Sequence, residues 1–377
     1  MNKIRTIFFL MLLCAVQVYG ALKTGSQLKQ LPVNTGLDGS QIQLEKYLGK
    51  KFVVLYIWTL NQASLNEFYP LSNALPQLRN DAEFISIGIG EAEQLKRFPG
   101  VSKQGIPVVA DSRQAAVKMF ARSGDTLPLC VLLDKDGTLL WRGKLQLLGK
   151  VLKECAAGKF NLAAEIEVEE FRTAVNAAIK KGDFEKALQL VSSEYKKHPR
   201  QLNLLKAQIA LLQKLKRQSE ALTLLHKVQS EQPHNYRIFE LEYTVLGATE
   251  DQQKLNDFFG RVKKNFAGKP QILMAFALAE CKLPPEKIDL AIILDLAETG
   301  WRSQAFSEKI SRGEYALDYA GILHSLGRND LASILAKEAC EDLKEDKKRY
   351  SKAVQALTYY TKIAKIAPGI KLPDLKK

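Results

Sequence analysis

The chain has 377 residues, enough for two or three domains, and its 46% hydrophobic and 25% charged residues exclude an extensively disordered protein. Its formal net charge is +14, and the basic excess is spread over both halves of the sequence. A spread excess indicates general attraction to anionic surfaces, including a peripheral anionic membrane surface, or simply a soluble basic surface. Lysines and arginines do not alternate with stacking aromatic residues, so we expect no nucleic-acid partner.

The first twenty residues have the pattern of a signal peptide. Lys3 and Arg5 precede ten apolar residues, and Val18 and Gly20 then occupy the −3 and −1 positions of a cleavage site before Ala21. The apolar run is too short to span a bilayer. We therefore expect cleavage near Gly20 and export to the periplasm or the exterior. Since no later segment is long and apolar enough to span a membrane, we expect the mature chain to be soluble or peripheral.

Removal of this segment would leave four widely spaced cysteines: Cys130, Cys155, Cys281 and Cys340. No C-x-x-C spacing occurs, which excludes zinc-type and thioredoxin-type cysteine pairs. Two alternatives stay open: disulfides, one within each half, or buried free thiols. The four histidines are isolated from one another, and we expect no metal and no cofactor.

Residues 22–158 predict an α/β sandwich. Continuous apolar runs predict buried strands, and Asp136-Gly137 between two of these runs is a strong hairpin signal. Apolar residues at helical spacing predict the helices. The predicted elements are strands at 52–58, 83–89, 129–133 and 138–142, and helices at 61–80, 115–120 and 147–157.

Three stretches of this half resemble TlpA-like thioredoxin domains: DGSQIQLEKYLGKKFVVLYIW, GIPVVADSRQAAVKMF and TLPLCVLLDKDGTLLWRGKL. They occur in the order and at the spacing of that family and cover about 130 residues. Trp58 matches the tryptophan that precedes the family's active site, and Pro70 matches the proline in its active-site helix. The resemblance implies a thioredoxin-like fold.

The sequence departs from the family at the redox site. Aligned on Trp58 and Pro70, the family's C-x-x-C pair falls on Gln62 and Leu65. Disulfide exchange needs an attacking thiolate and a resolving thiol, and neither an amide nor an isobutyl group can supply one. We therefore expect no catalytic residue at this site.

The resemblance also implies a cis proline at Pro128, in a loop that faces the active-site helix and holds extended peptides. Together with Trp58 and Gln62, Pro128 would form a peptide-binding platform. In the alternative interpretation, Pro128 only shapes the loop and Trp58 only fills the core. Cys130 follows in an apolar strand and is expected to be a buried, inert thiol.

Residues 164–366 predict an all-α solenoid that resembles tetratricopeptide (TPR) repeats, followed by a frayed tail at 367–377. The Ala187-Leu188 pair and Pro199 recur 34 residues later as Ala221-Leu222 and Pro233. These repeats define units at 168–201 and 202–235, and Gly327 and Ala332 indicate a third at 313–346. Between them, residues 236–312 keep helical periodicity but lose the register.

The resemblance places a groove of basic and amide side chains on the first helices of the first two units: Arg172, Asn176, Lys180, Asn203, Lys206, Gln213 and Lys214. Such groups suit acidic peptides or a C-terminal carboxylate. Ala207 stands where a complete carboxylate clamp would have asparagine, so the clamp is broken. The alternative is a merely solvated helix face.

These observations favour an exported, non-catalytic binding or assembly protein with protein or peptide partners in the cell envelope. The alternative is a thiol-disulfide oxidoreductase that uses a cysteine outside a C-x-x-C pair, such as Cys130 or Cys155. In a third interpretation, the thioredoxin-like domain only caps the end of the solenoid.

Overall fold

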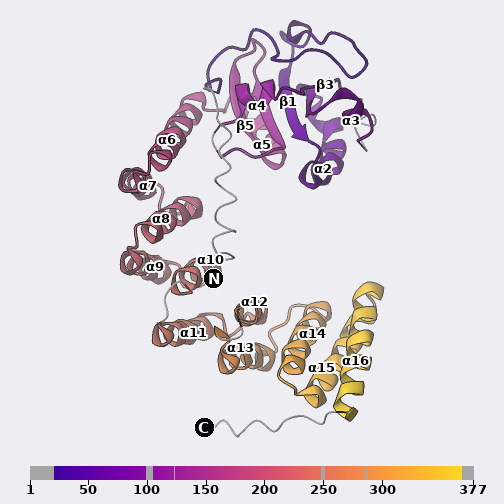
Figure 1. Ribbon diagram of the computed structural model, residues 1–377, viewed down its shortest axis with the longest axis vertical. Helices are drawn as coiled ribbons and strands as arrows, with labels where there is room; N and C mark the ends of the chain where they lie inside the picture. The colour runs from indigo at the N-terminus through magenta and orange to yellow at the C-terminus, as the bar shows by residue number, and fades with distance from the viewer. Residues whose placement is uncertain (1–20, 99–104, 123, 248–250, 285–286, 367–377) are drawn as a thin grey trace. The chain divides into compact units, whose positions relative to one another are not determined.

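The computed structural model describes residues 21–98, 105–122, 124–247, 251–284 and 287–366 (Figure 1). The predicted signal peptide and the predicted tail lie outside these residues. The chain forms two compact units that divide between Ser193 and Glu194.

The first unit contains a five-stranded mixed sheet in the order β3-β2-β1-β4-β5. Its strands are β1 (Phe52–Thr59), β2 (Ala82–Ile89), β3 (Val108–Ala110), β4 (Leu129–Leu133) and β5 (Leu139–Gly143). β1 runs parallel to β2, and β2 runs parallel to β3, whereas β4 is antiparallel to both β1 and β5. This order and these directions are those of a thioredoxin-like fold, which confirms the expected fold class. The three-residue strand β3 was not among the strands predicted from sequence.

Two hydrophobic layers cover the sheet, because β1 and β4 carry continuous apolar runs that are buried on both faces. The helices of this part are η1 (Leu44–Lys46), α2 (Gln62–Leu78), α3 (Ala92–Lys96), α4 (Ala115–Phe120) and α5 (Leu145–Ala156). Side chains of α2 and α5 pack against one face, with Leu71, Leu75 and Leu148 fully or almost fully buried. α4 covers the other face through Ala116 and Phe120.

The rest of the described chain is helical. Its helices are α6 (Leu162–Lys180), α7 (Phe184–Lys197), α8 (Leu202–Lys214), α9 (Gln218–Glu231), α10 (Tyr236–Leu246), α11 (Gln252–Phe266), α12 (Pro270–Glu280), α13 (Leu290–Ser303), α14 (Lys309–Ser325), α15 (Asn329–Leu343) and α16 (Lys347–Ile366). In the second unit, α8 contacts α9 and α10, and α14 contacts α12, α13, α15 and α16. Contacts with both the next helix and the next but one are typical of a solenoid. Among the described helices, none combines the length and apolarity needed to cross a membrane.

A backbone motif repeats at the predicted 34-residue spacing after α6 and α8, and occurs again after α14. Gly182 and Lys216 follow α6 and α8 in the left-handed conformation, with φ of 78° and 60°, and Gly327 follows α14 with φ of 73°. After each, the next amide donates to the carbonyl five residues earlier, as in a Schellman motif: Asp183 to Ala178, Arg217 to Leu212, and Arg328 to Leu323. Ala187, Ala221 and Ala332 lie five residues beyond these three positions, and each is fully buried.

The two compact units do not divide at the same place as the domains expected from sequence. The first expected domain ends at 158, in the turn between α5 and α6, and the second begins at 164, in the first turn of α6. The compact units instead divide within α7, so α6 belongs with the sheet.

The left-handed caps generate a stability prediction. We expect Lys216→Gly to stabilise the protein by about 0.5–1 kcal/mol, because a lysine at φ of 60° is strained where glycine is not. Gly182→Ala should destabilise by about 1 kcal/mol for the converse reason. Urea unfolding measures both changes. Lys206→Gly, an exposed lysine inside α8, is the control and should cost about 1 kcal/mol; stabilisation by this control would contradict the explanation.

Candidate functional site

The first turn of α2 stands where the redox cysteines of the resembled family would be. Asn61 caps this helix, its side-chain oxygen accepting a hydrogen bond from the amide of Ser64 at 2.9 Å. Gln62 is the first residue of the helix, is exposed, and donates from Nε2 to the side-chain oxygen of Asn66 at 2.9 Å. Leu65 is the fourth residue of α2. Neither position carries sulfur, so the helix N-terminus has no thiol to activate.

Trp58 lies at the end of β1 and is fully buried. Its indole Nε1 donates to the hydroxyl of Ser86 at 2.7 Å, and its ring stacks on Phe98 with the centroids 5.0 Å apart. Gly88 is required beside it, because a Cβ atom there would come within 2.8 Å of the indole. The expected role of Trp58 in a peptide platform is therefore corrected: Trp58 has no surface to offer a ligand and fills the core.

The loop before β4 has the cis peptide bond, between Leu127 and Pro128, that the resemblance implies. Antiparallel pairing of Ile57 with Leu129 places this loop at the same end of the central strands as the end of β1 and the start of α2. Lys144 fastens the loop: its ammonium donates to the carbonyl oxygens of Thr126 at 2.9 Å and Pro128 at 3.0 Å. Within the described chain, no hydrogen bond uses the amide or carbonyl of the half-buried Leu127. The loop before β4 thus offers one backbone donor and one backbone acceptor, both from Leu127.

All four cysteines of the described chain are free. Cys130 is fully buried opposite Tyr56 in the β1–β4 ladder, and its pKa is raised by burial and by the negative charge of Glu67. Burial and Glu154 raise the pKa of the half-buried Cys155 to about 11. The pKa values of Cys281 and Cys340 are also raised, chiefly by burial. Of the two alternatives open for the cysteines, the structure has the free thiols, and none has the lowered pKa of a nucleophile.

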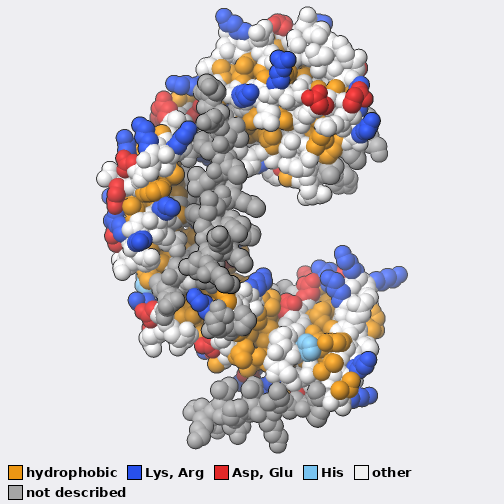
Figure 2. All heavy atoms as spheres, viewed as in Figure 1, with side chains coloured by type: hydrophobic (Ala, Val, Ile, Leu, Met, Phe, Trp, Pro, Cys, Tyr) orange, Lys and Arg blue, Asp and Glu red, His pale blue; other side chains and the backbone are white. Residues whose placement is uncertain are grey.

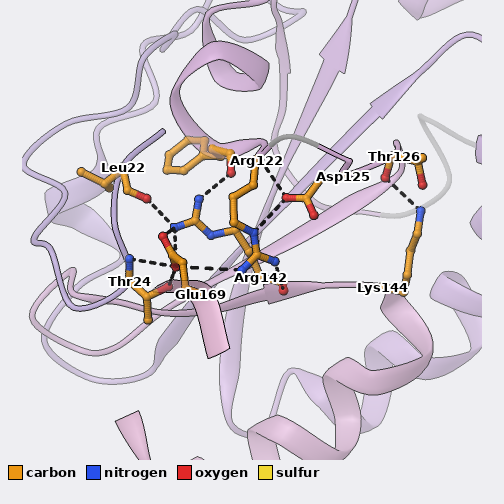
Figure 3. Close-up of polar contacts among 9 residues, drawn as sticks. Leu22, Thr24, Arg122, Asp125, Thr126, Arg142, Lys144 and Glu169 are labelled. Atoms are coloured by element: carbon orange, nitrogen blue, oxygen red, sulfur yellow. Dashed lines mark hydrogen bonds and ion pairs between the residues drawn. The ribbon is translucent and has the colours of Figure 1, made fainter. Parts of the chain in front are cut away.

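A buried ionic cluster joins α6 to the sheet (Figure 3). Arg142 of β5 has a fully buried side chain that pairs with Glu169 of α6 at 3.3 Å. The guanidinium also donates to the carbonyls of Phe120, at 2.7 Å, and Leu22. Glu169 accepts hydrogen bonds from both the amide, at 3.2 Å, and the hydroxyl of Thr24.

Around this pair, Arg122 lies 3.9 Å from Glu169 and forms an ion pair with Asp125 at 3.2 Å. The cluster explains why α6 is part of the first compact unit. Sequence reasoning missed it, and its only signal was a lone arginine between Trp141 and Gly143 in an otherwise apolar strand.

The expected groove residues lie on two helices. Arg172 and Lys180 are exposed on α6, where Asn176 is half-buried. On α8, in the second unit, the remaining residues of the set share one face at helical spacing: Asn203, Lys206, Gln213 and Lys214. Gln213 is half-buried and the other three are exposed. Each helix therefore presents its own basic and amide surface.

No protein-family model matches the chain, and no curated protein matches it. Solved structures are similar over about a third of its length. The thioredoxin domain of a thiol-disulfide oxidoreductase from Bacteroides vulgatus is 16% identical, with 37% of this chain and 100% of that chain covered and a TM-score of 0.31. A cysteine-to-serine mutant of PrxQ from Xylella fastidiosa is 19% identical over 37% and 99% of the two chains, with a TM-score of 0.31.

A secreted disulfide oxidoreductase of Mycobacterium tuberculosis is 18% identical over 29% of this chain and 81% of that chain, with a TM-score of 0.25. The fold assignment rests on the strand order and strand directions described above, and not on these likenesses.

The buried ion pair generates the second prediction. Glu169→Ala should destabilise the protein by about 3 kcal/mol, because it leaves the Arg142 guanidinium buried without its carboxylate. The double variant Arg142→Met with Glu169→Leu should recover most of this loss, since apolar side chains of similar volume replace both charges. The free energy of urea unfolding measures both. A double variant less stable than Glu169→Ala would show that the cluster does not act as a charge pair.

Proposed function

We propose that this protein is an exported, non-catalytic binding and assembly protein. A redoxin-type module binds peptides at the loop before β4 without thiol chemistry, and a TPR-like helical region binds a protein partner in the cell envelope. The observation that carries the proposal is the first turn of α2, where Gln62 and Leu65 occupy the cysteine positions.

Thiol chemistry elsewhere in the chain is the competing function. An oxidoreductase needs an accessible thiol that ionises near neutral pH. Cys130 is fully buried, and the pKa of Cys155 is raised to about 11, so under one per cent of Cys155 would be thiolate at neutral pH. These two features favour binding over redox catalysis.

Peptide binding at the first unit is supported by the loop at Leu127. A loop backbone with an unused amide and carbonyl can form main-chain hydrogen bonds with an extended peptide. Lys144 donates to the flanking carbonyls of Thr126 and Pro128, so two hydrogen bonds restrain the loop before a ligand arrives. The exposed side-chain amide of Gln62 lies at the same end of the central strands as this loop.

Protein binding by the helical region is supported by the repeated caps and by α8. Repeated helix pairs build an extended surface, and the exposed Lys206 and Lys214 would suit an acidic peptide or a terminal carboxylate on that surface.

Site-specific photocrosslinking tests the binding proposal. A benzoylphenylalanine at Gln62 should form discrete adducts in envelope extracts, whereas one at Lys135, at the opposite end of the central strands, should not. Lys144→Met should reduce the Gln62 adducts at least threefold, because the loop loses the amine that holds two of its carbonyls. Lys153→Met, an exposed lysine on α5, is the matched control. Equal adducts from Gln62 and Lys135, or equal losses in the two methionine variants, would refute a binding site here.

Placing cysteines at positions 62 and 65 tests the proposed absence of thiol chemistry. The unaltered chain should not accelerate the reduction of insulin disulfides by dithiothreitol. Gln62→Cys with Leu65→Cys should gain this activity, because the N-terminus of α2 lowers the pKa of a thiol placed there. Activity in the unaltered chain that disappears on Cys130→Ser with Cys155→Ser would establish the competing oxidoreductase function instead.

A further inference from the structure

α16 is the last helix of the described chain, and one face of it packs on the second unit. Ala353 is fully buried in a cluster with Ala339 and Leu343 of α15. Leu357 and Tyr360 pack against a neighbouring cluster that contains Leu335. These contacts fix which side of α16 faces the protein.

The charge of α16 has a single sign. Between Lys347 and Ile366 it carries six basic side chains and no acidic one. Arg349 is neutralised locally, because it pairs with Glu314 and Asp346 at 2.5 Å each. The other five are exposed lysines, and no ion pair involving them occurs within the described residues: Lys347, Lys348, Lys352, Lys362 and Lys365.

Apolar side chains are exposed among these lysines. Tyr359 is 51% exposed and Ile366 is 69% exposed. At 3.6 residues per turn, both residues and all five lysines fall on the half of α16 opposite Ala353. Figure 2 shows lysine and arginine side chains gathered at the end of this unit that α16 forms. The outward face therefore combines unneutralised positive charge with the aliphatic Ile366 and the half-exposed Tyr359, whose ring also contacts His324 of α14.

We propose that this face of α16 binds the surface of an anionic lipid bilayer. The lysines would meet lipid phosphates, each contributing about 1 kcal/mol close to the surface. Tyr359 and Ile366 would enter the headgroup boundary, where aromatic and aliphatic groups are stabilised. The two apolar residues decide between partners, because an acidic polymer would leave Ile366 in water. The inference is independent of the peptide site proposed above.

Vesicle cosedimentation of the chain without residues 1–20 tests the proposal. The protein should bind phosphatidylcholine vesicles that contain about one third phosphatidylglycerol at about 0.1 M salt, and bind neither phosphatidylcholine alone nor the mixed vesicles at about 0.5 M salt. The triple variant of Lys352, Lys362 and Lys365, each changed to Glu, should lower the partition coefficient at least tenfold. Tyr359→Ser with Ile366→Ser should lower it several-fold.

The matched control changes three exposed lysines of α7, α9 and α11 to Glu: Lys196, Lys227 and Lys264. Its net charge equals that of the α16 triple variant, so it should bind within about twofold of the unaltered chain. An equal loss in both triple variants would overturn the proposal in favour of diffuse charge. Absence of binding to the mixed vesicles would refute it outright. The face would be assigned to an anionic polymer by two results together. The Tyr359→Ser, Ile366→Ser variant would bind the mixed vesicles fully, and polyglutamate or duplex DNA would bind the unaltered chain but not the α16 triple variant.

Discussion

A helix N-terminus can lower a pKa only where a side chain has a proton to lose, and the first turn of α2 presents an amide at Gln62 and an aliphatic group at Leu65. Everything we infer about this module depends on that constraint. β1 leads into the helix, Asn61 caps it, and the cis bond before Pro128 shapes the facing loop. Thiol-based electron transfer would need sulfur in this first turn, whereas main-chain pairing with a peptide would not.

The Arg142–Glu169 cluster adds a second constraint, on where the first unit ends. Two charges withdrawn from water are tolerated when they are paired, and Arg142 also donates to a backbone carbonyl, so this contact strongly favours one position of α6 against β5. The first helix after the sheet, α6, is therefore part of the first compact unit. The domain boundary predicted at 158–164 lies near the start of α6, whereas the compact units divide within α7.

Much of the first unit could be predicted from sequence, because β1 and β2 are long apolar runs and Asp136-Gly137 marks a hairpin. β3 was missed because three residues are too few to show a period. The burial of Trp58 depends on Ser86 and Phe98, which come from other elements, and the Arg142–Glu169 contact spans 27 positions. Local patterns carry no such information. In the helical region the period was visible in Ala187 and Ala221, but a lysine at position 216 does not predict a left-handed backbone conformation there.

The shared cap geometry has an evolutionary consequence. Gly182 and Lys216 end their helices with the same hydrogen-bonded ring, so the chain leaves the first helix of each pair along an equivalent path. Duplication or deletion of a whole 34-residue segment between such joints would leave each remaining joint intact, whereas a shorter indel inside a pair would displace every buried alanine beyond it. Length variation among homologues should therefore come in whole segments or be confined to the turns.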